Sequence, residues 1–131
     1  MPLSFVRVAS LAEVPTDHGL RVRVRDVDIA LYRIDDMVYA MEDACPHAGW
    51  PLSRGRLEGC VIVCEAHGWP FDIRTGFDPN NADGFPIPCF AVRLIGHGAG
   101  DARGEVAVEV DLDQQTNDPR EMRRQRARIS E

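Results

Sequence analysis

The fold of this chain is decided by two short stretches, Cys45-Pro46-His47-Ala48-Gly49-Trp50-Pro51-Leu52 and Cys64-Glu65-Ala66-His67-Gly68-Trp69-Pro70-Phe71-Asp72. The first contains Cys-x-His and the second Cys-x-x-His, with sixteen residues between the two motifs. Two thiolates and two imidazoles are enough to bind a metal without further ligands. The remaining Cys and His residues form no such pair; they are His18, Cys60, Cys89 and His97. We therefore predict a metal centre held by Cys45, His47, Cys64 and His67.

Two kinds of metal centre use two Cys and two His: a tetrahedral zinc site and a [2Fe–2S] cluster of the Rieske kind. Structural zinc sites usually pair Cys with Cys and His with His. Here each stretch pairs one Cys with one His. A two-iron cluster suits this arrangement, because each stretch can then give a thiolate to one iron and an imidazole to the other. The spacing favours iron–sulfur over the alternative, a zinc-stabilised interaction module.

The chain resembles the Rieske [2Fe–2S] family over roughly residues 40–95, and the two stretches carry the resemblance. A glycine closely follows each His, where a loop folding tightly over a cluster needs backbone without a Cβ. The resemblance implies one [2Fe–2S] cluster per chain, with Cys45 and Cys64 on one iron and His47 and His67 on the other. It also implies an all-β fold, an antiparallel β sandwich or barrel with a small cluster-binding subdomain.

Departures from the family pattern predict a low reduction potential. High-potential members carry a second Cys in each loop, joined as a disulfide, where this chain has Trp50 and Ala66. They also carry Ser and Tyr hydroxyls that hydrogen-bond the cluster region, where this chain has Trp69 and Phe71. Hydrogen bonds to sulfur stabilise the reduced cluster, so their loss lowers the potential. Rieske potentials span about −150 to +300 mV, and we predict a midpoint below roughly 0 mV.

A carrier with a low potential can accept electrons from a flavin and reduce an iron site that activates oxygen. The resemblance is strongest to the ferredoxins of bacterial aromatic-ring dioxygenase and monooxygenase systems. It implies two partners, an NAD(P)H-dependent flavin reductase and a terminal oxygenase, that dock transiently near His47 and His67. The small subunit of an NADH-dependent nitrite reductase is the main alternative within this family.

The chain has 131 residues, which predicts one domain without room for a second, catalytic iron domain. A mononuclear oxygenase iron needs two His and a carboxylate, and only His18 and His97 remain, far apart in the sequence. We therefore predict an electron-transfer component with no catalytic residues of its own, and a monomer.

The net charge of −6 argues against nucleic acid and anionic membranes as partners. An acidic body suits docking to a basic patch on a redox partner, or simply solubility. No apolar run approaches the ~20 residues of a membrane span, and the first residues lack a signal-peptide core. Cys60 and Cys89 are expected to be core thiols, and unpaired thiols suit a reducing cytoplasm. We expect a cytoplasmic protein.

Strict alternation of apolar and Arg residues over 20–25 predicts a half-buried strand. Together with strands at 29–34 and 37–41, separated by turns at 26–28 and 35–36, it predicts an antiparallel meander. Further strands are predicted at 5–8, 90–95 and 105–110, a hairpin arm at 57–64 and a Pro-rich loop at 77–89.

We assign residues 1–112 to the Rieske domain, with the cluster-binding part at about 42–90, and residues 113–131 to a charged tail. Five Arg and two Glu lie within 119–131. Asp118-Pro119-Arg120-Glu121 matches a helix capping box with Pro at the first helical position. Disorder, a short exposed helix and a partner-docking helix all remain open for this tail.

Overall fold

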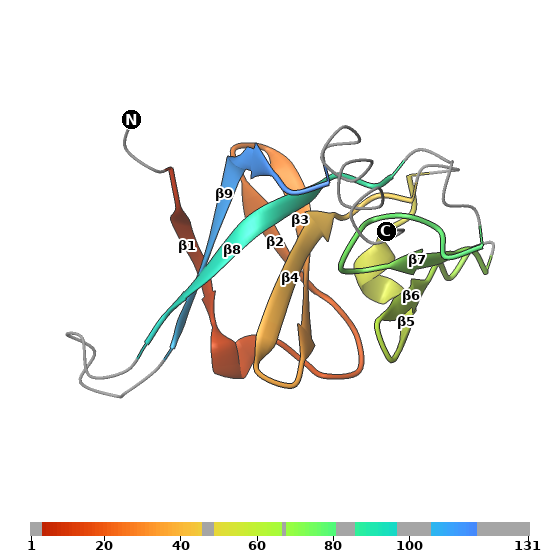
Figure 1. The fold of residues 1–131 in the computed structure, drawn as a ribbon, viewed down its shortest axis with the longest axis horizontal. Helices are drawn as coiled ribbons and strands as arrows, with labels where there is room; N and C mark the ends of the chain where they lie inside the picture. The colour runs from red at the N-terminus through yellow and green to blue at the C-terminus, as the bar shows by residue number, and fades with distance from the viewer. Residues whose placement is uncertain (1–3, 46–48, 67, 81–85, 97–105, 118–131) are drawn as a thin grey trace, which may run out of the picture.

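The computed structural model describes residues 4–45, 49–66, 68–80, 86–96 and 106–117. This part of the chain forms two antiparallel sheets and two short 3-10 helices (Figure 1). In chain order the elements are β1 (Val6–Ser10), η1 (Leu11–Glu13), β2 (Leu20–Val24), β3 (Val27–Ile34), β4 (Met37–Glu42), η2 (Leu52–Arg54), β5 (Arg56–Glu58), β6 (Val61–Val63), β7 (Pro70–Asp72), β8 (Cys89–Ile95) and β9 (Ala107–Gln115).

The larger sheet has the strand order β1-β9-β8-β4-β3-β2 and curls so that its edge strands β1 and β2 lie close together. The predicted meander is confirmed as β2, β3 and β4, with Leu20 opposite Leu31 and Tyr32 opposite Tyr39. The exposed Arg21 and Arg23 on β2 alternate with more buried apolar side chains, as the sequence predicts. The all-β, barrel-like fold expected from the sequence is therefore confirmed.

Strand β3 is buried on both faces, because successive side chains of a strand point to opposite sides of the sheet. Ile29 and Leu31 pack inside the barrel with Val108 and other apolar side chains. Ala30 and Tyr32 pack on the other side, in a second group of buried side chains that also contains Cys45 and Cys64. One face of β3 thus packs inside the barrel, and its other face packs against the cluster-binding part.

The smaller sheet has the order β5-β6-β7 and lies beyond the end of β4 (Figure 1). Ile62 of β6 and Phe71 of β7 are opposite each other, and both are buried in the same group of apolar side chains as Cys45 and Cys64. The sheet carries the second Cys/His stretch between β6 and β7. Apolar burial against β3 therefore fixes the position of that stretch relative to the barrel.

Three details differ from the sequence-based expectations. The turn predicted at 26–28 lies at Arg25 and Asp26, which adopt positive φ of 49° and 66°, so that β3 begins at Val27. Cys60, expected in the core, is half-buried. It forms the two-residue β5–β6 turn with Gly59, and the apolar strand β6 begins only after it. Strand β9 extends to Gln115, well beyond 110, because its pairing with β8 continues there, with Ala91 opposite Asp111 and Phe90 opposite Gln115.

Several expectations concern residues that are only partly described. Residues 77–80 and 86–88 contain neither helix nor strand, as predicted for this loop, and 81–85 lie outside the described residues. The tail from 118 also lies outside them, so the domain boundary after 112 stays a prediction. Among the described helices, none has the length and apolar character that crossing a membrane requires.

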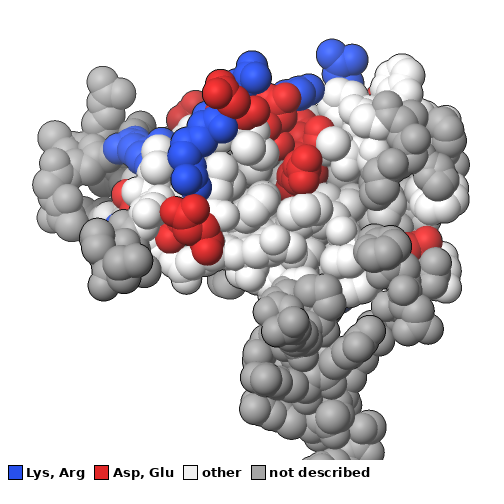
Figure 2. Space-filling model, turned by 90° about the horizontal axis from the view of Figure 1, so that it is seen from above, with Lys and Arg blue, Asp and Glu red and all other residues white. Residues whose placement is uncertain are grey.

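Charged side chains on the barrel are arranged mainly as ion pairs. Arg93 contacts Glu109 at 2.6 Å, and Arg25 contacts Asp113 at 3.1 Å. Figure 2 shows acidic and basic side chains interspersed in a band, with much of the remaining described surface of that face uncharged. The described part of this face thus offers no extended positive patch of the kind that binds nucleic acid.

Candidate metal centre

The first Cys/His stretch begins just after β4 and closes on itself around Cys45. The backbone N–H of Cys45 donates to the carbonyl of Trp50 at 2.8 Å, and the N–H of Gly49 donates to the carbonyl of Cys45 at 2.9 Å. Gly49 has a φ of +70°, a conformation that side chains with a Cβ rarely adopt. The glycine therefore lets the chain return tightly after the predicted ligand His47.

The second stretch repeats the same turn. The N–H of Cys64 donates to the carbonyl of Trp69 at 2.9 Å, and the N–H of Gly68 donates to that of Cys64 at 2.8 Å. Gly68 also has a φ of +70°. The two turns match at Cys, Gly and Trp, although the His stands two residues after Cys in one and three after it in the other. Sequence reasoning missed this duplication, which the shared Cys-x-x-x-Gly-Trp-Pro spacing could have revealed.

Both thiols are buried at the base of their turns. Cys45 is 2% exposed and Cys64 is 1% exposed, and both pack in the group of buried side chains that contains Leu52, Ile62 and Phe71. Neither forms a disulfide. Ionised thiolates are costly in such surroundings unless a metal compensates their charge, and soft thiolates are the ligands that iron–sulfur clusters use. Paired, equivalent turns that present buried thiols therefore fit a cluster.

The other two predicted ligands, His47 and His67, lie outside the described residues. No group of three or more metal-ligand side chains converges within the part of the chain that the structure does describe. The four-residue ligand set thus stays a prediction. The structure describes the two Cys of this set and places Cys45 and Cys64 in the same group of buried side chains.

The first turn is fastened at its base by a buried carboxylate that sequence reasoning missed. Asp43 accepts hydrogen bonds from the backbone N–H of Ser53 at 2.7 Å and from the Ser53 hydroxyl at 2.6 Å. The Asp43 side chain is fully buried, and Arg21 Nε lies 3.7 Å from it. An Asp two residues before a Cys carries no signal of this role, because its partner is ten residues away.

The side chain of Asn117, which is 1% exposed, holds together the two ends of the Pro-rich segment at 77–89. Its side-chain oxygen accepts hydrogen bonds from Cys89 N at 3.2 Å and from the Gln115 amide at 2.9 Å. Its Nδ2 donates to the carbonyls of Thr75 and Ile87. All four hydrogen-bonding positions of the amide are therefore used, which ties the end of β9 to both ends of the segment.

Two aromatic side chains stand at equivalent positions on the outside of the turns. Trp50 and Trp69 are 44% and 42% exposed, as expected for residues that line the tip of the cluster-binding part. Large exposed aromatic side chains are enriched where proteins bind one another.

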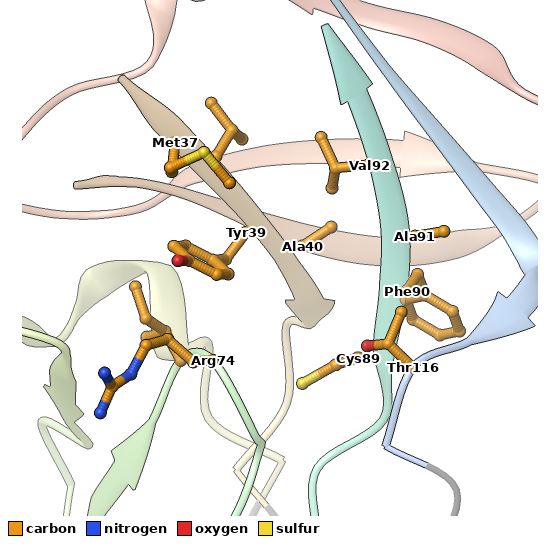
Figure 3. Close-up of a pocket in the computed structure, with 11 residues that line it drawn as sticks. Met37, Tyr39, Ala40, Arg74, Cys89, Phe90, Ala91, Val92 and Thr116 are labelled. Carbon is orange, nitrogen blue, oxygen red and sulfur yellow. The ribbon is translucent and has the colours of Figure 1, made fainter. Parts of the chain in front are cut away.

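A hollow of about 350 Å³ opens between β4 and β8, which pair only at Ala40–Phe90 and Met41–Cys89 (Figure 3). Tyr39 and Arg74 line one side of it and Cys89 lies at its base. Burial raises the pKa of the Cys89 thiol to about 12, and the carboxylate of Asp72 adds to the shift. Cys89 is therefore a core thiol as expected, and a poor nucleophile or ligand.

Comparison with known proteins identifies the family. The sequence matches the Rieske [2Fe-2S] domain family over residues 4–89. It is 30% identical over 95 residues to the biphenyl dioxygenase ferredoxin subunit of Pseudomonas sp. (strain KKS102), covering 72% of this chain and 87% of that protein. The chain therefore belongs to the Rieske family, and its cofactor is a [2Fe–2S] cluster and not a zinc ion.

Solved structures agree with this assignment. A ferredoxin of Sphingomonas yanoikuyae B1 matches with a TM-score of 0.65 and 26% identity, over 82% of this chain and 98% of that one. A chain from the complex of reduced oxygenase and oxidized ferredoxin in carbazole 1,9a-dioxygenase matches with a TM-score of 0.65 and 30% identity, over 84% and 94%. The predicted likeness to ferredoxin components of dioxygenase systems is confirmed.

Proposed function

We propose that this protein carries single electrons from an NAD(P)H-dependent flavin reductase to a terminal oxygenase of the aromatic-ring dioxygenase or monooxygenase type. The observation that carries the proposal is the pair of equivalent turns that bury Cys45 and Cys64. The bound cluster supplies one-electron chemistry. The cluster is held by these two Cys together with His47 and His67, one thiolate pair and one imidazole pair.

The chain's own residues insulate one side of the site and leave the other available to a partner. Leu52, Ile62 and Phe71 pack against the thiols and exclude water from them. Trp50 and Trp69 are exposed on the same turns, so a partner that docks there approaches close to His47 and His67. Redox partners typically bury less than about 1,200 Å², which suits a monomer that exchanges two partners in turn.

The side chains around the second turn support a low potential. Phe71 occupies a buried position without any hydrogen-bond donor on its ring. Trp69 is partly exposed, so its side chain extends at least in part towards solvent. Position 71 in the second turn thus lacks the Tyr hydroxyl that would stabilise the reduced state, and the midpoint potential lies below roughly 0 mV. The protein works in the cytoplasm, without nucleic acid or membrane as a partner.

Reconstitution with surrogate partners tests the function. The anaerobically purified protein is mixed with NADH and the reductase of a biphenyl dioxygenase system, and bleaching of its visible absorption is followed. The reduced protein is then mixed with the matching oxygenase and substrate. We expect reduction by the reductase and product formation that both require this protein. Iron–sulfur absorption without reduction by any flavin reductase tested would contradict the proposal.

A further inference from the structure

Asp43 combines complete burial of its carboxylate with a position two residues before Cys45. Two residues span at most about 7.6 Å between Cα atoms, so the residue that carries this charge lies close to the residue that carries the first thiol. Both carboxylate oxygens are engaged: one accepts from Ser53 N at 2.7 Å, the other from the Ser53 hydroxyl at 2.6 Å. The carboxylate therefore joins the two ends of the first turn.

Ser53 is held from its other side as well. Its carbonyl accepts a hydrogen bond from Gly19 N at 3.3 Å, and a Cβ added to Gly19 would lie 2.9 Å from the Ser53 Cα. Gly19 directly precedes β2, so η2 is clamped between the start of β2 and the end of β4. The far end of the first turn has no freedom to move without breaking these contacts.

The second turn is closed differently. It lies between β6 and β7, which pair along their whole length, with Val63 opposite Pro70 at the mouth of the turn. The first turn lies between β4 and η2, which share no ladder among the described strands. The Asp43–Ser53 contact therefore takes the place of a strand ladder, and it brings a negative charge that a ladder would not.

The charge of Asp43 is only partly compensated. Among the described residues Asp43 has one ion pair, with Arg21, whose Nε lies 3.7 Å from Asp43 Oδ2, while Arg21 Nη2 donates to Asp28 at 2.5 Å. The Arg21 side chain is 45% exposed, so water screens it. One shared, half-exposed guanidinium thus faces a fully buried carboxylate.

We propose that Asp43 is a positioning residue with two effects on the proposed electron carrier: it fixes the first turn on the barrel, and its buried charge lowers the reduction potential. The proposal rests on the ligand role of Cys45. Reduction adds a negative charge to the site, which a nearby buried carboxylate disfavours and a nearby guanidinium favours. Asp43 and Arg21 therefore shift the midpoint potential in opposite directions.

Redox titration of four variants separates the charge effect from a merely structural one. Asp43→Asn keeps the shape of the side chain and an oxygen to accept from Ser53 N, so we expect a higher midpoint than in the wild type. Arg21→Gln should lower the midpoint. The matched control for Arg21 is Arg23→Gln, since Arg23 also faces Asp28, at 3.9 Å. The control for Asp43 is Asp111→Asn, a buried carboxyl on β9.

Ser53→Ala tests the clamp. It removes one hydrogen bond to the carboxylate but no charge, so the midpoint should stay near the wild-type value. Loss of the visible absorption in the presence of a chelator should become roughly tenfold faster. Equal midpoints for Asp43→Asn and Asp111→Asn, together with an unshifted Arg21→Gln, would overturn the proposal.

Two further outcomes are distinct. If Asp43→Asn does not fold, comparing Arg21→Gln with its control Arg23→Gln still tests the charge effect. Only Arg21→Gln should lower the midpoint potential. A wild-type protein without iron–sulfur absorption would refute the proposed function itself. A wild-type protein with normal absorption and unmoved midpoints in the variants would refute the role of Asp43 alone.

Discussion

Single residues with unusual backbone or burial set the local geometry of the cluster-binding part. Gly76 has a φ of +80°, and a Cβ there would lie 2.2 Å from the carbonyl oxygen of Ile87 and 2.6 Å from Asn117 Nδ2. Gly76 also accepts the hydrogen bond from Ile87 N at 2.8 Å. The neck of the Pro-rich segment is therefore a place where only glycine fits.

Replacing Gly76 should be far more harmful than replacing a glycine that has only the unusual φ. Gly76→Ala combines backbone strain with a clash against main chain, and we expect a loss of about 3 kcal/mol. Gly59→Ala is the control, since Gly59 has a φ of +61° but open space around it, and about 1 kcal/mol is expected. Denaturant unfolding of both variants checks this; equal losses would contradict the close packing at Gly76.

The buried thiol of Cys89 should make stability fall at high pH. Its pKa is raised to about 12 in the folded protein, against about 8.5 in an unfolded chain. Below about pH 8.5 both states hold the proton, and above it the unfolded state loses the proton first. Relative to Cys89→Ala, the wild type should therefore lose roughly 2 kcal/mol between pH 8 and pH 10.5.

The control for that measurement is Cys60→Ala, which removes a half-buried thiol in the β5–β6 turn. Unfolding free energies are compared at the two pH values for each variant. A difference between wild type and Cys89→Ala that is independent of pH would show that the thiol is not shielded as the structure describes.

At the scale of elements, β3 joins the two halves of the molecule. Leu31 and Tyr32 are both 0% exposed but face opposite sides. The Tyr32 hydroxyl has no hydrogen-bond partner among the described residues, and burial raises the pKa of this hydroxyl. Its ring therefore contributes apolar packing, whereas its oxygen contributes a desolvation penalty.

This asymmetry predicts different results for adjacent substitutions. Tyr32→Phe removes an unsatisfied polar atom and should leave stability unchanged or raise it by about 1 kcal/mol. Leu31→Ala opens a cavity in the barrel and should cost about 3 kcal/mol. Thermal and denaturant unfolding decide; a Tyr32→Phe variant destabilised by more than about 1 kcal/mol would show that the hydroxyl has a partner.

Some elements could be predicted from the sequence because their signals are local. The alternation of residues 20–25 identified β2, and the Cys/His spacing identified the kind of centre. The turn predicted at 26–28 begins one residue earlier, at Arg25, because a positive φ is uncommon for Arg and the sequence carries no signal for it. The sequence also predicts β9 too short, because its polar end is part of the sheet only through pairing with β8.

The supports of the site could not be predicted, because they join residues far apart in the chain. Asp43 contacts Ser53, ten residues away, and Asn117 contacts Thr75, 42 residues away. Their residue types are common at surfaces, and only the folded chain brings them into buried contacts. The sequence therefore predicts candidate ligands of the centre more readily than the residues that support the two turns.

At the scale of the whole molecule, the exposed tip should control exchange with partners. Trp50→Ala and Trp69→Ala should lower the second-order rate constant of electron transfer from the reductase by about tenfold, since exposed aromatic side chains often dominate small interfaces. The visible spectrum should stay unchanged. Stopped-flow mixing measures the rates. Met37→Ala is the control, because Met37 is 58% exposed and lies on β4, away from both turns.

If the two Trp side chains only shield the cluster, the result differs. Transfer rates would then stay at the wild-type value, while the absorption would decay faster in air. That outcome would contradict a docking role for the tip and would leave the fold and the cofactor untouched.

The central claim is that one iron is bound by the buried thiols of Cys45 and Cys64 and the other by His47 and His67. Pulsed EPR of the reduced protein, prepared with nitrogen-15-labelled histidine, tests it most directly. We predict hyperfine couplings from two imidazole nitrogens, reduced to one in either His47→Cys or His67→Cys. A reduced cluster that shows no coupling to histidine nitrogen would contradict the account.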